Sequence, residues 1–220
     1  MSKIGWRFAC PVLFLTLVSL LLPGCSLKKA VQQSAPEKRH FVLEASRSDS
    51  AGPAGNQSVL YVRDVTVSPR YEGAGFVYKR GESEYMTDFY NRFLIPPDLL
   101  VTQEVRDWVL AAGVFGQVID SGSLVAPTHA LEGRVNALYG DYTVQPSNAV
   151  LEIELFLVED PLNRSAVVFH ERYREEVSLD DGKPESLVRG WNTALARALG
   201  ELEQDLGAVK LQTPHAEGDP

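Results

Sequence analysis

Three apolar-rich segments in the second half of the chain decide the fold: HALEGRVNALYGDY (residues 129–142), AVLEIELFLVE (149–159) and SAVVFHERYREEVSL (165–179). Gln145-Pro-Ser-Asn148 and Asp160-Pro-Leu-Asn163 separate them, and these residue types favour turns. Long strands that follow one another through short turns are typical of an antiparallel meander. The stretch therefore predicts a sheet at the centre of the protein.

Two segments with helical periodicity accompany this meander. The first begins at Pro96-Pro97-Asp98 and is expected to stop at Gly113, because prolines and an early acid favour a first helical turn and glycine favours the end of a helix. The second extends from about Pro184 to Leu206, entered through Asp180-Asp181-Gly182. Each has one apolar stripe: Val101, Val105, Trp108, Val109 and Ala112 in the first, and Leu187, Val188, Trp191, Leu195, Leu199, Leu202 and Leu206 in the second. We interpret Trp108 and Trp191 as core anchors.

Shorter strands are predicted in the first half of the chain. They are Phe41–Glu44, Val59–Val67, a hairpin of Phe76–Tyr78 with Tyr85–Tyr90 closed through residues 80–83, and Phe115–Ile119. Together with the meander and the helices, they predict an α/β protein of the α+β kind. We expect one mostly antiparallel or mixed sheet backed by two amphipathic helices, in a single domain over residues 41–206.

The first 26 residues carry the clearest functional information. Lys3 and Arg7 precede an apolar segment from Phe8 to Leu22, which is the pattern of a secretory signal and is too short to span a bilayer comfortably. The segment ends in Leu22-Pro-Gly-Cys25, which resembles the bacterial lipobox, although Pro23 stands where Ala, Ser or Thr is usual. We expect residues 1–24 to be a signal peptide and Cys25 to carry S-diacylglycerol and N-palmitoyl groups. The alternatives are an uncleaved anchor, or an ordinary secretory signal with an incidental cysteine.

Removal of the signal changes the composition of the chain. Its other cysteine, Cys10, is discarded, so the mature chain of 196 residues has no partner for a disulfide. It keeps 19 basic and 29 acidic residues, a formal charge of −10, which argues against nucleic acid or an anionic membrane face as the main partner, because both need clustered cations. Residues 25–40 are polar and read as a lipidated N-terminus with a flexible tether, and residues 207–220 read as a disordered tail.

No catalytic or metal-binding constellation is visible in the sequence. Nothing matches a nucleophile elbow, a zinc-protease helix or a phosphate loop, and we expect no cofactor, no metal and no enzymatic activity. His129 and His170 could meet across the sheet, but strand histidines without a carboxylate signature are usually structural. The charged segment Glu171–Glu176 suits an exposed sheet face or a sheet edge, where charges block unwanted strand addition. Tyr85, Phe89, Tyr90 and Phe93, with Tyr71 and Tyr78 nearby, are expected mostly to pack internally, and an exposed part could contact a partner or lipid.

The order of these features resembles a known family. A lipobox cysteine and a tether precede Val59–Val67, Pro69-Arg-Tyr71, residues 75–80 (GFVYKR), an aromatic segment entering Pro96-Pro97, a helix that ends at Gly113-Val-Phe115, Leu131-Glu-Gly-Arg-Val135 and a terminal amphipathic helix. This arrangement is similar to the ABC-type transport auxiliary lipoproteins, the PqiC-like family. A departure is residues 90–97 (YNRFLIPP), where many members have an Arg-Trp segment.

The resemblance implies an outer-membrane lipoprotein with a periplasmic domain, since Ser26 is not the Asp that retains lipoproteins in the inner membrane. Its partners would be an MCE-type substrate-binding protein and an ABC permease and ATPase that move lipid and support envelope integrity. A homo-oligomer is compatible with this role. The alternative function is a stand-alone lipoprotein that binds lipid or lipopolysaccharide, or assists outer-membrane assembly, without an ABC partner.

Overall fold

The computed structural model describes residues 37–47, 56–163 and 165–210. The helices and strands that the structure describes lie in the unit from Lys38 onward. Their bounds are β1 (Arg39–Phe41), β2 (Val59–Val62), β3 (Thr66–Val67), β4 (Gly75–Lys79), β5 (Tyr85–Phe93), α2 (Pro97–Ala112), β6 (Gln117–Ile119), β7 (His129–Asp141), β8 (Asn148–Glu159), β9 (Ala166–Ser178) and α3 (Pro184–Ala208).

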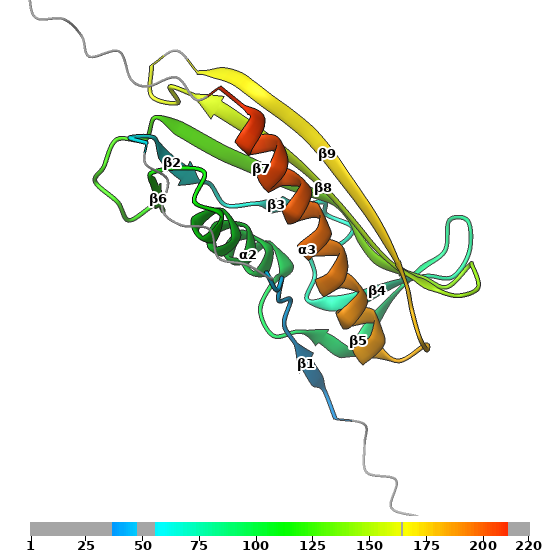
Figure 1. The fold of residues 1–220 in the computed structure, drawn as a ribbon. Helices are drawn as coiled ribbons and strands as arrows, with labels where there is room; N and C mark the ends of the chain where they lie inside the picture. The colour runs from blue at the N-terminus through cyan, green and yellow to red at the C-terminus, as the bar shows by residue number, and fades with distance from the viewer. Residues whose placement is uncertain (1–36, 48–55, 164, 211–220) are drawn as a thin grey trace, which may run out of the picture. The chain divides into compact units, whose positions relative to one another are not determined.

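The long strand β7 is the centre of the sheet (Figure 1). On one side it pairs antiparallel with β8 along its whole length, and β8 pairs in the same way with β9. On its other side it pairs in turn with β2, β3 and β4, all parallel to it. β5 continues the sheet antiparallel to β4, while β1 and β6 form its outer ends through parallel pairs with β5 and β2. The predicted meander and the predicted mixed sheet are therefore confirmed.

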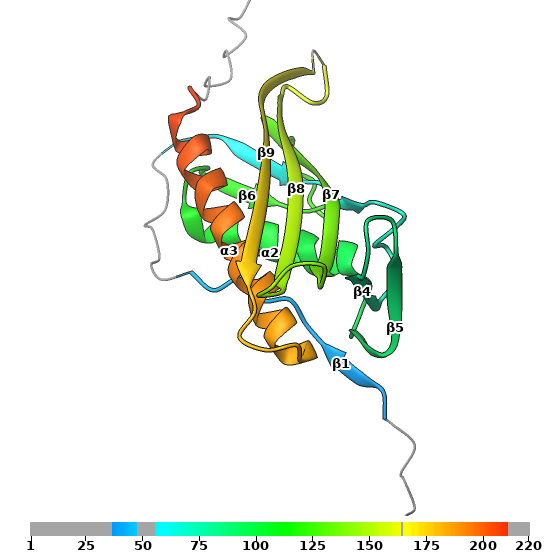
Figure 2. The ribbon, with the colours of Figure 1, turned by 90° about the vertical axis from the view of Figure 1, so that its right-hand side faces the viewer.

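The two helices cover one face of this sheet (Figures 1 and 2). Both helices have the predicted apolar stripes, and every residue of those stripes is buried. α2 ends at Gly113, whose φ of 64° is the left-handed conformation that favours glycine at a helix C-terminus. Trp191 lies at the centre of the core, with its ring 5.0 Å from that of Phe76 and 5.5 Å from that of Phe93.

The prediction of one continuous strand over Val59–Val67 was wrong. The structure has β2 and β3 separated at residues 63–65. The buried positions change there from even-numbered residues, Leu60 and Val62, to odd-numbered ones, Val65 and Val67, which a continuous strand would not allow. At the break, the backbone N–H of Val65 donates to Oγ1 of Thr102 in α2, at 2.8 Å, instead of to a strand. A contact with a helix distant in sequence therefore overrides the local alternation.

The predicted strand over Phe41–Glu44 was also misplaced, because β1 is Arg39–Phe41. His40, which the sequence had placed in the tether, lies in this strand. After Phe41 the chain leaves the sheet and enters the space between the helices, where the N–H of Glu44 donates to Asn192 Oδ1 and that of Ala45 donates to Glu104 Oε2. Side chains of α3 and α2 thus replace a strand partner. α3 extends to Ala208, two residues into the predicted tail.

Candidate functional site

The predicted lipidation site, Cys25, lies outside the described residues, and so do the rest of residues 1–36 and the tail from residue 211. Lipidation of Cys25 therefore stays a prediction. Within residues 37–47, 56–163 and 165–210, no helix is long and apolar enough to cross a membrane. The same residues contain no group of three or more His, Cys, Asp or Glu side chains that could hold a metal ion.

The structure does not bring His129 and His170 together. His129 is buried at the start of β7 beside the ring of Phe115, and burial lowers the pKa of its imidazole. Thr128 Oγ1 lies 2.8 Å from its Nδ1. His170 lies on β9, stacked at 4.2 Å on Phe156 of β8. The two histidines therefore belong to different environments, and they share no ligand position.

The sheet face turned away from the helices carries a ladder of charges, which we call the charged face: Glu132, Arg134, Glu152, Glu154, His170, Arg172, Arg174 and Glu176. The strand register places Arg134, Glu154 and Arg172 directly across from one another on β7, β8 and β9. In the next row Glu152 lies opposite Arg174, whose Nη1 is 3.0 Å from Glu152 Oε2. Opposite charges at cross-strand positions stabilise a sheet, so the sequence alternation on Glu171–Glu176 is explained by pairing.

Glu154 is the most connected member of the charged face. Its carboxylate accepts hydrogen bonds from Arg172 Nη2 at 3.1 Å and Asn136 Nδ2 at 3.2 Å, and lies 2.8 Å from His170 Nε2. Hydrogen bonding from His170, then Asn136 and Arg172, lowers the pKa of Glu154 to about 2. A carboxylate held ionised in this way is a poor proton donor or acceptor near neutral pH. The charged face suits contact with water or with a polar protein surface.

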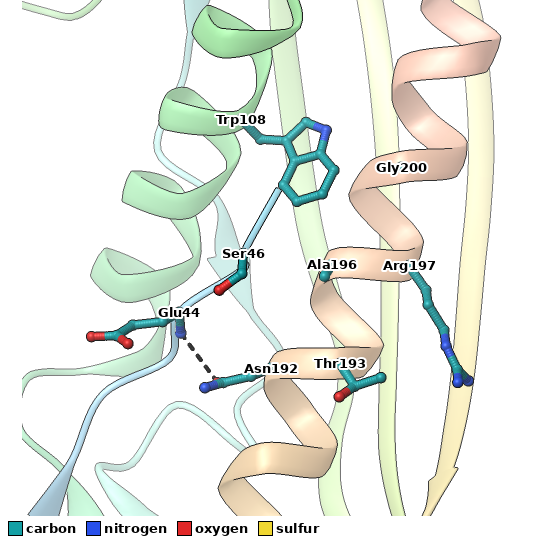
Figure 3. Close-up of a pocket in the computed structure, with 8 residues that line it drawn as sticks. All are labelled: Glu44, Ser46, Trp108, Asn192, Thr193, Ala196, Arg197 and Gly200. Atoms are coloured by element: carbon teal, nitrogen blue, oxygen red, sulfur yellow. Dashed lines mark hydrogen bonds between the residues drawn. The ribbon is translucent and has the colours of Figure 1, made fainter. Parts of the chain in front are cut away.

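A groove lies between α2 and α3 (Figure 3). It has a volume of about 490 Å³ and is lined by Glu44, Ser46, Trp108, Asn192, Thr193, Ala196, Arg197 and Gly200. Its wall is held by polar contacts, since Glu203 Oε2 accepts from the indole N–H of Trp108 at 3.0 Å. Polar and charged side chains at the rim do not suit a fatty acyl chain, which favours an apolar cavity.

The predicted aromatic group is divided between the core and the surface. Tyr71, Tyr78 and Phe93 are buried, and burial, then Tyr85, raises the pKa of Tyr71 to about 12. Phe89 and Tyr90, in contrast, keep 64% and 41% of their surface exposed.

Sequence reasoning missed Asp88, whose side chain accepts the backbone N–H groups of both Tyr90 and Asn91. Local bonding of an Asp to the backbone two residues on is a known turn signal, and it could have located this irregularity.

No protein-family model matches the sequence, and no curated protein matches it with significance. Solved structures do match the fold. A crystal structure of an uncharacterized protein superposes with a TM-score of 0.62 at 15% identity, covering 77% of this chain and 99% of that one. Protein XCC0632 from Xanthomonas campestris, of the family DUF330, gives a TM-score of 0.61 at 14% identity, covering 77% of this chain and 93% of that protein. Lipoprotein GNA1162 from Neisseria meningitidis is a weaker match, with a TM-score of 0.36 at 9% identity and coverage of 68% and 94%. The first two matches show a shared fold.

Proposed function

We propose that the chain is a lipoprotein of the bacterial outer membrane that acts as a non-catalytic auxiliary subunit of an MCE/ABC-type lipid transport system. The observation that carries the proposal is Leu22-Pro-Gly-Cys25 at the end of an export signal, followed by a short polar segment before β1. Burial of acyl chains is worth about 0.8 kcal/mol per methylene, so the two or three chains expected on Cys25 would hold the domain permanently at a membrane.

The domain contributes binding surfaces to this role. The order of its motifs resembles the ABC-type transport auxiliary lipoproteins, and its fold is like that of a DUF330 protein. The charged face offers alternating acidic and basic side chains. These can pair with complementary charges on a polar partner surface and fix how the two surfaces align. The ATPase and the permease would be separate chains. The alternative, direct lipid binding, requires a deep apolar cavity, whereas the groove between α2 and α3 is open and has the charged residues Glu44 and Arg197 in its lining.

A genetic test separates the anchor from the transport role. In a strain that lacks the gene, the wild-type chain should restore resistance to detergents, and Cys25→Ala should fail because no acyl chain can be attached. Cys10→Ala is the matched control, since this cysteine lies in the apolar part of the signal and should be replaceable without effect. If a chain exported through an ordinary signal, without lipid, fully restores detergent resistance, the anchoring role is contradicted.

The transport role has its own test. Deletion of the MCE-type protein together with this gene should sensitise cells no more than either single deletion, because both losses stop one pathway. Additive sensitivity of the double deletion would contradict the transport role and favour a stand-alone lipoprotein.

A further inference from the structure

An irregularity in the β4–β5 hairpin projects two aromatic side chains from the surface. Val77 pairs with Thr87, but Gly75 pairs with Arg92, so that the single residue Phe76 stands opposite residues 88–91. We call residues 88–91 the aromatic bulge. Phe89 and Tyr90 at its tip have their rings edge to face with centroids 5.2 Å apart. Two adjacent exposed aromatic side chains are thus presented together.

The aromatic bulge is held firmly by Asp88. One carboxylate oxygen accepts the N–H of Tyr90 at 2.7 Å and that of Asn91 at 3.0 Å. The other accepts from the hydroxyl of Tyr78 and the amide of Asn91, both at 2.8 Å. Burial acts to raise the pKa of Asp88, but these hydrogen bonds outweigh it and lower the pKa. The aromatic side chains are therefore presented on a preorganised backbone.

The backbone of the bulge also packs closely on β4. A Cβ at Gly75 would lie 2.6 Å from the carbonyl oxygen of Asp88 and 2.8 Å from Cγ2 of Thr87. Since real Cβ atoms do not approach a carbonyl oxygen that closely, glycine is required at residue 75 for this arrangement. The bulge is thus built into the hairpin from both strands.

The aromatic bulge lies where the chain enters the domain. β1 pairs with the end of β5, with Arg39 opposite Asn91, and the ammonium group of Lys38 lies 4.3 Å from the ring centroid of Phe89. β1 and β5 lie together at one end of the domain, and β6 lies at the other end (Figures 1 and 2). Lys38, one residue before β1, is therefore in contact with the aromatic bulge.

The chain that precedes Lys38 sets what this end of the domain can reach. Thirteen residue steps separate Cys25 from Lys38. They allow at most about 45 Å, and about 20 Å is typical for a flexible coil. Basic side chains occur along this stretch, with Lys28 and Lys29 close to the cysteine in sequence and Lys38 and Arg92 beside the bulge, while the acidic residues are Glu37 and, within the bulge, Asp88. Aromatic rings flanked by cations are the side-chain types that favour an anionic lipid–water interface.

We propose that Phe89 and Tyr90 insert into the headgroup region of the membrane that holds the acylated Cys25, so that the domain contacts phospholipid at a second, non-covalent point. This inference rests on the proposed lipid anchor. The covalent lipid fixes the distance of the domain from the membrane, and the aromatic bulge fixes its orientation, with the β1–β5 end toward the lipid. The β6 end then faces away into the periplasm.

The test uses the full-length lipidated protein in vesicles of phosphatidylethanolamine and phosphatidylglycerol. Acylation blocks Cys25 and signal cleavage removes Cys10, so a Phe89→Cys variant presents one reactive thiol for a fluorescent dye. Leu124→Cys is the matched control, because Leu124 is fully exposed in the loop after β6. Insertion by the 5–10 Å typical of interfacial segments should make the dye at residue 89 on the order of tenfold less accessible to aqueous iodide than the dye at residue 124.

A second variant tests the aromatic side chains without a label. In the unlabelled protein, vesicles should slow hydrogen exchange in β5 relative to detergent, and Phe89→Ser/Tyr90→Ser should abolish the slowing while keeping the tryptophan fluorescence of the fold. Equal quenching at residues 89 and 124 would overturn the inference and leave the lipid anchor intact. Protection that appears only when a partner protein is added would also overturn it, in favour of a protein interface. If the wild-type chain keeps a reactive thiol at Cys25 and does not bind vesicles, both the lipid anchor and the membrane contact of the aromatic bulge are contradicted.

Discussion

Replacement of glycine by alanine is expected to have opposite effects at two positions of α3. Gly190 faces the sheet, and a Cβ added there would lie 2.6 Å from the Cβ of Ala149 and 3.0 Å from Cδ2 of Leu179. Gly200 lies ten residues further along the helix, and a Cβ there would meet only Cζ2 of Trp108, at an ordinary 3.9 Å. Gly190→Ala and Gly200→Ala therefore form a matched pair within one helix.

The magnitudes follow from two competing terms. Alanine stabilises a helix interior by about 0.5–1 kcal/mol relative to glycine, and this gain applies at both positions. At Gly190 the new methyl group overlaps that of Ala149 by about 1 Å, since carbon atoms pack best at about 3.5–4.0 Å. Overpacking of this kind costs about 1–3 kcal/mol, because the helix must move away from β8. We expect Gly190→Ala to lower the free energy of unfolding by about 1–2 kcal/mol, and Gly200→Ala to raise it by up to about 1 kcal/mol.

Urea unfolding followed by tryptophan fluorescence measures both changes, since Trp191 and Trp108 lie in the core. For a domain of this size, 1 kcal/mol corresponds to about 2–4 °C in Tm, so thermal unfolding gives an independent value. A Gly190→Ala protein as stable as the wild type, or two variants that shift in the same direction, would show that Gly190 is not needed for close packing against β8.

Three further predictions concern charged and titratable groups. Because its pKa in the folded protein is lowered to about 2, Glu154 stabilises the fold above the ordinary carboxyl range and loses this contribution as the pH falls toward 2. Glu154→Gln should therefore cost about 1 kcal/mol at pH 7, a value discounted for solvent screening, and nothing at the acid end of a series of urea titrations. Asp88→Asn should lower the free energy of unfolding by about 1–3 kcal/mol through the loss of charge-assisted hydrogen bonds. The control Asp120→Asn, in an exposed turn, should stay within about 0.5 kcal/mol of wild type. Equal effects of the two substitutions would contradict the role of Asp88. Burial lowers the pKa of His129 in the folded protein. As the pH falls below about 6.5, this imidazole is therefore protonated more readily in the unfolded state than in the folded state, and the free energy of unfolding should decline. His129→Phe should flatten that decline, and an unchanged slope would show that another group causes it.

The helices and the meander could be predicted because their patterns are local. The stripe that contains Trp191 repeats at helical spacing, and the turns at residues 145–148 and 160–163 carry their own proline and asparagine signals. Pairing between neighbours in sequence then follows from short connections.

The parallel pairing of β2, β3 and β4 with β7 could not be predicted in the same way. It joins residues about 60 to 70 positions apart, and the break at Val65 depends on a hydroxyl of α2 that no local pattern reveals. The aromatic bulge was likewise hidden, because the aromatic residues from Tyr85 to Phe93 look alike in sequence. Their burial is decided by Asp88 and by the pairing of β1 with β5.

We propose above that this domain works from a lipid anchor beside an MCE-type transporter. The most direct measurement is in-cell crosslinking with purification of the tagged chain, followed by detection of the MCE-type protein in wild-type and Cys25→Ala strains. We expect the MCE-type protein to be recovered with an acylated wild-type chain and to be strongly reduced with Cys25→Ala. A wild-type chain that is acylated at Cys25 but recovers no MCE-type protein would contradict the claim.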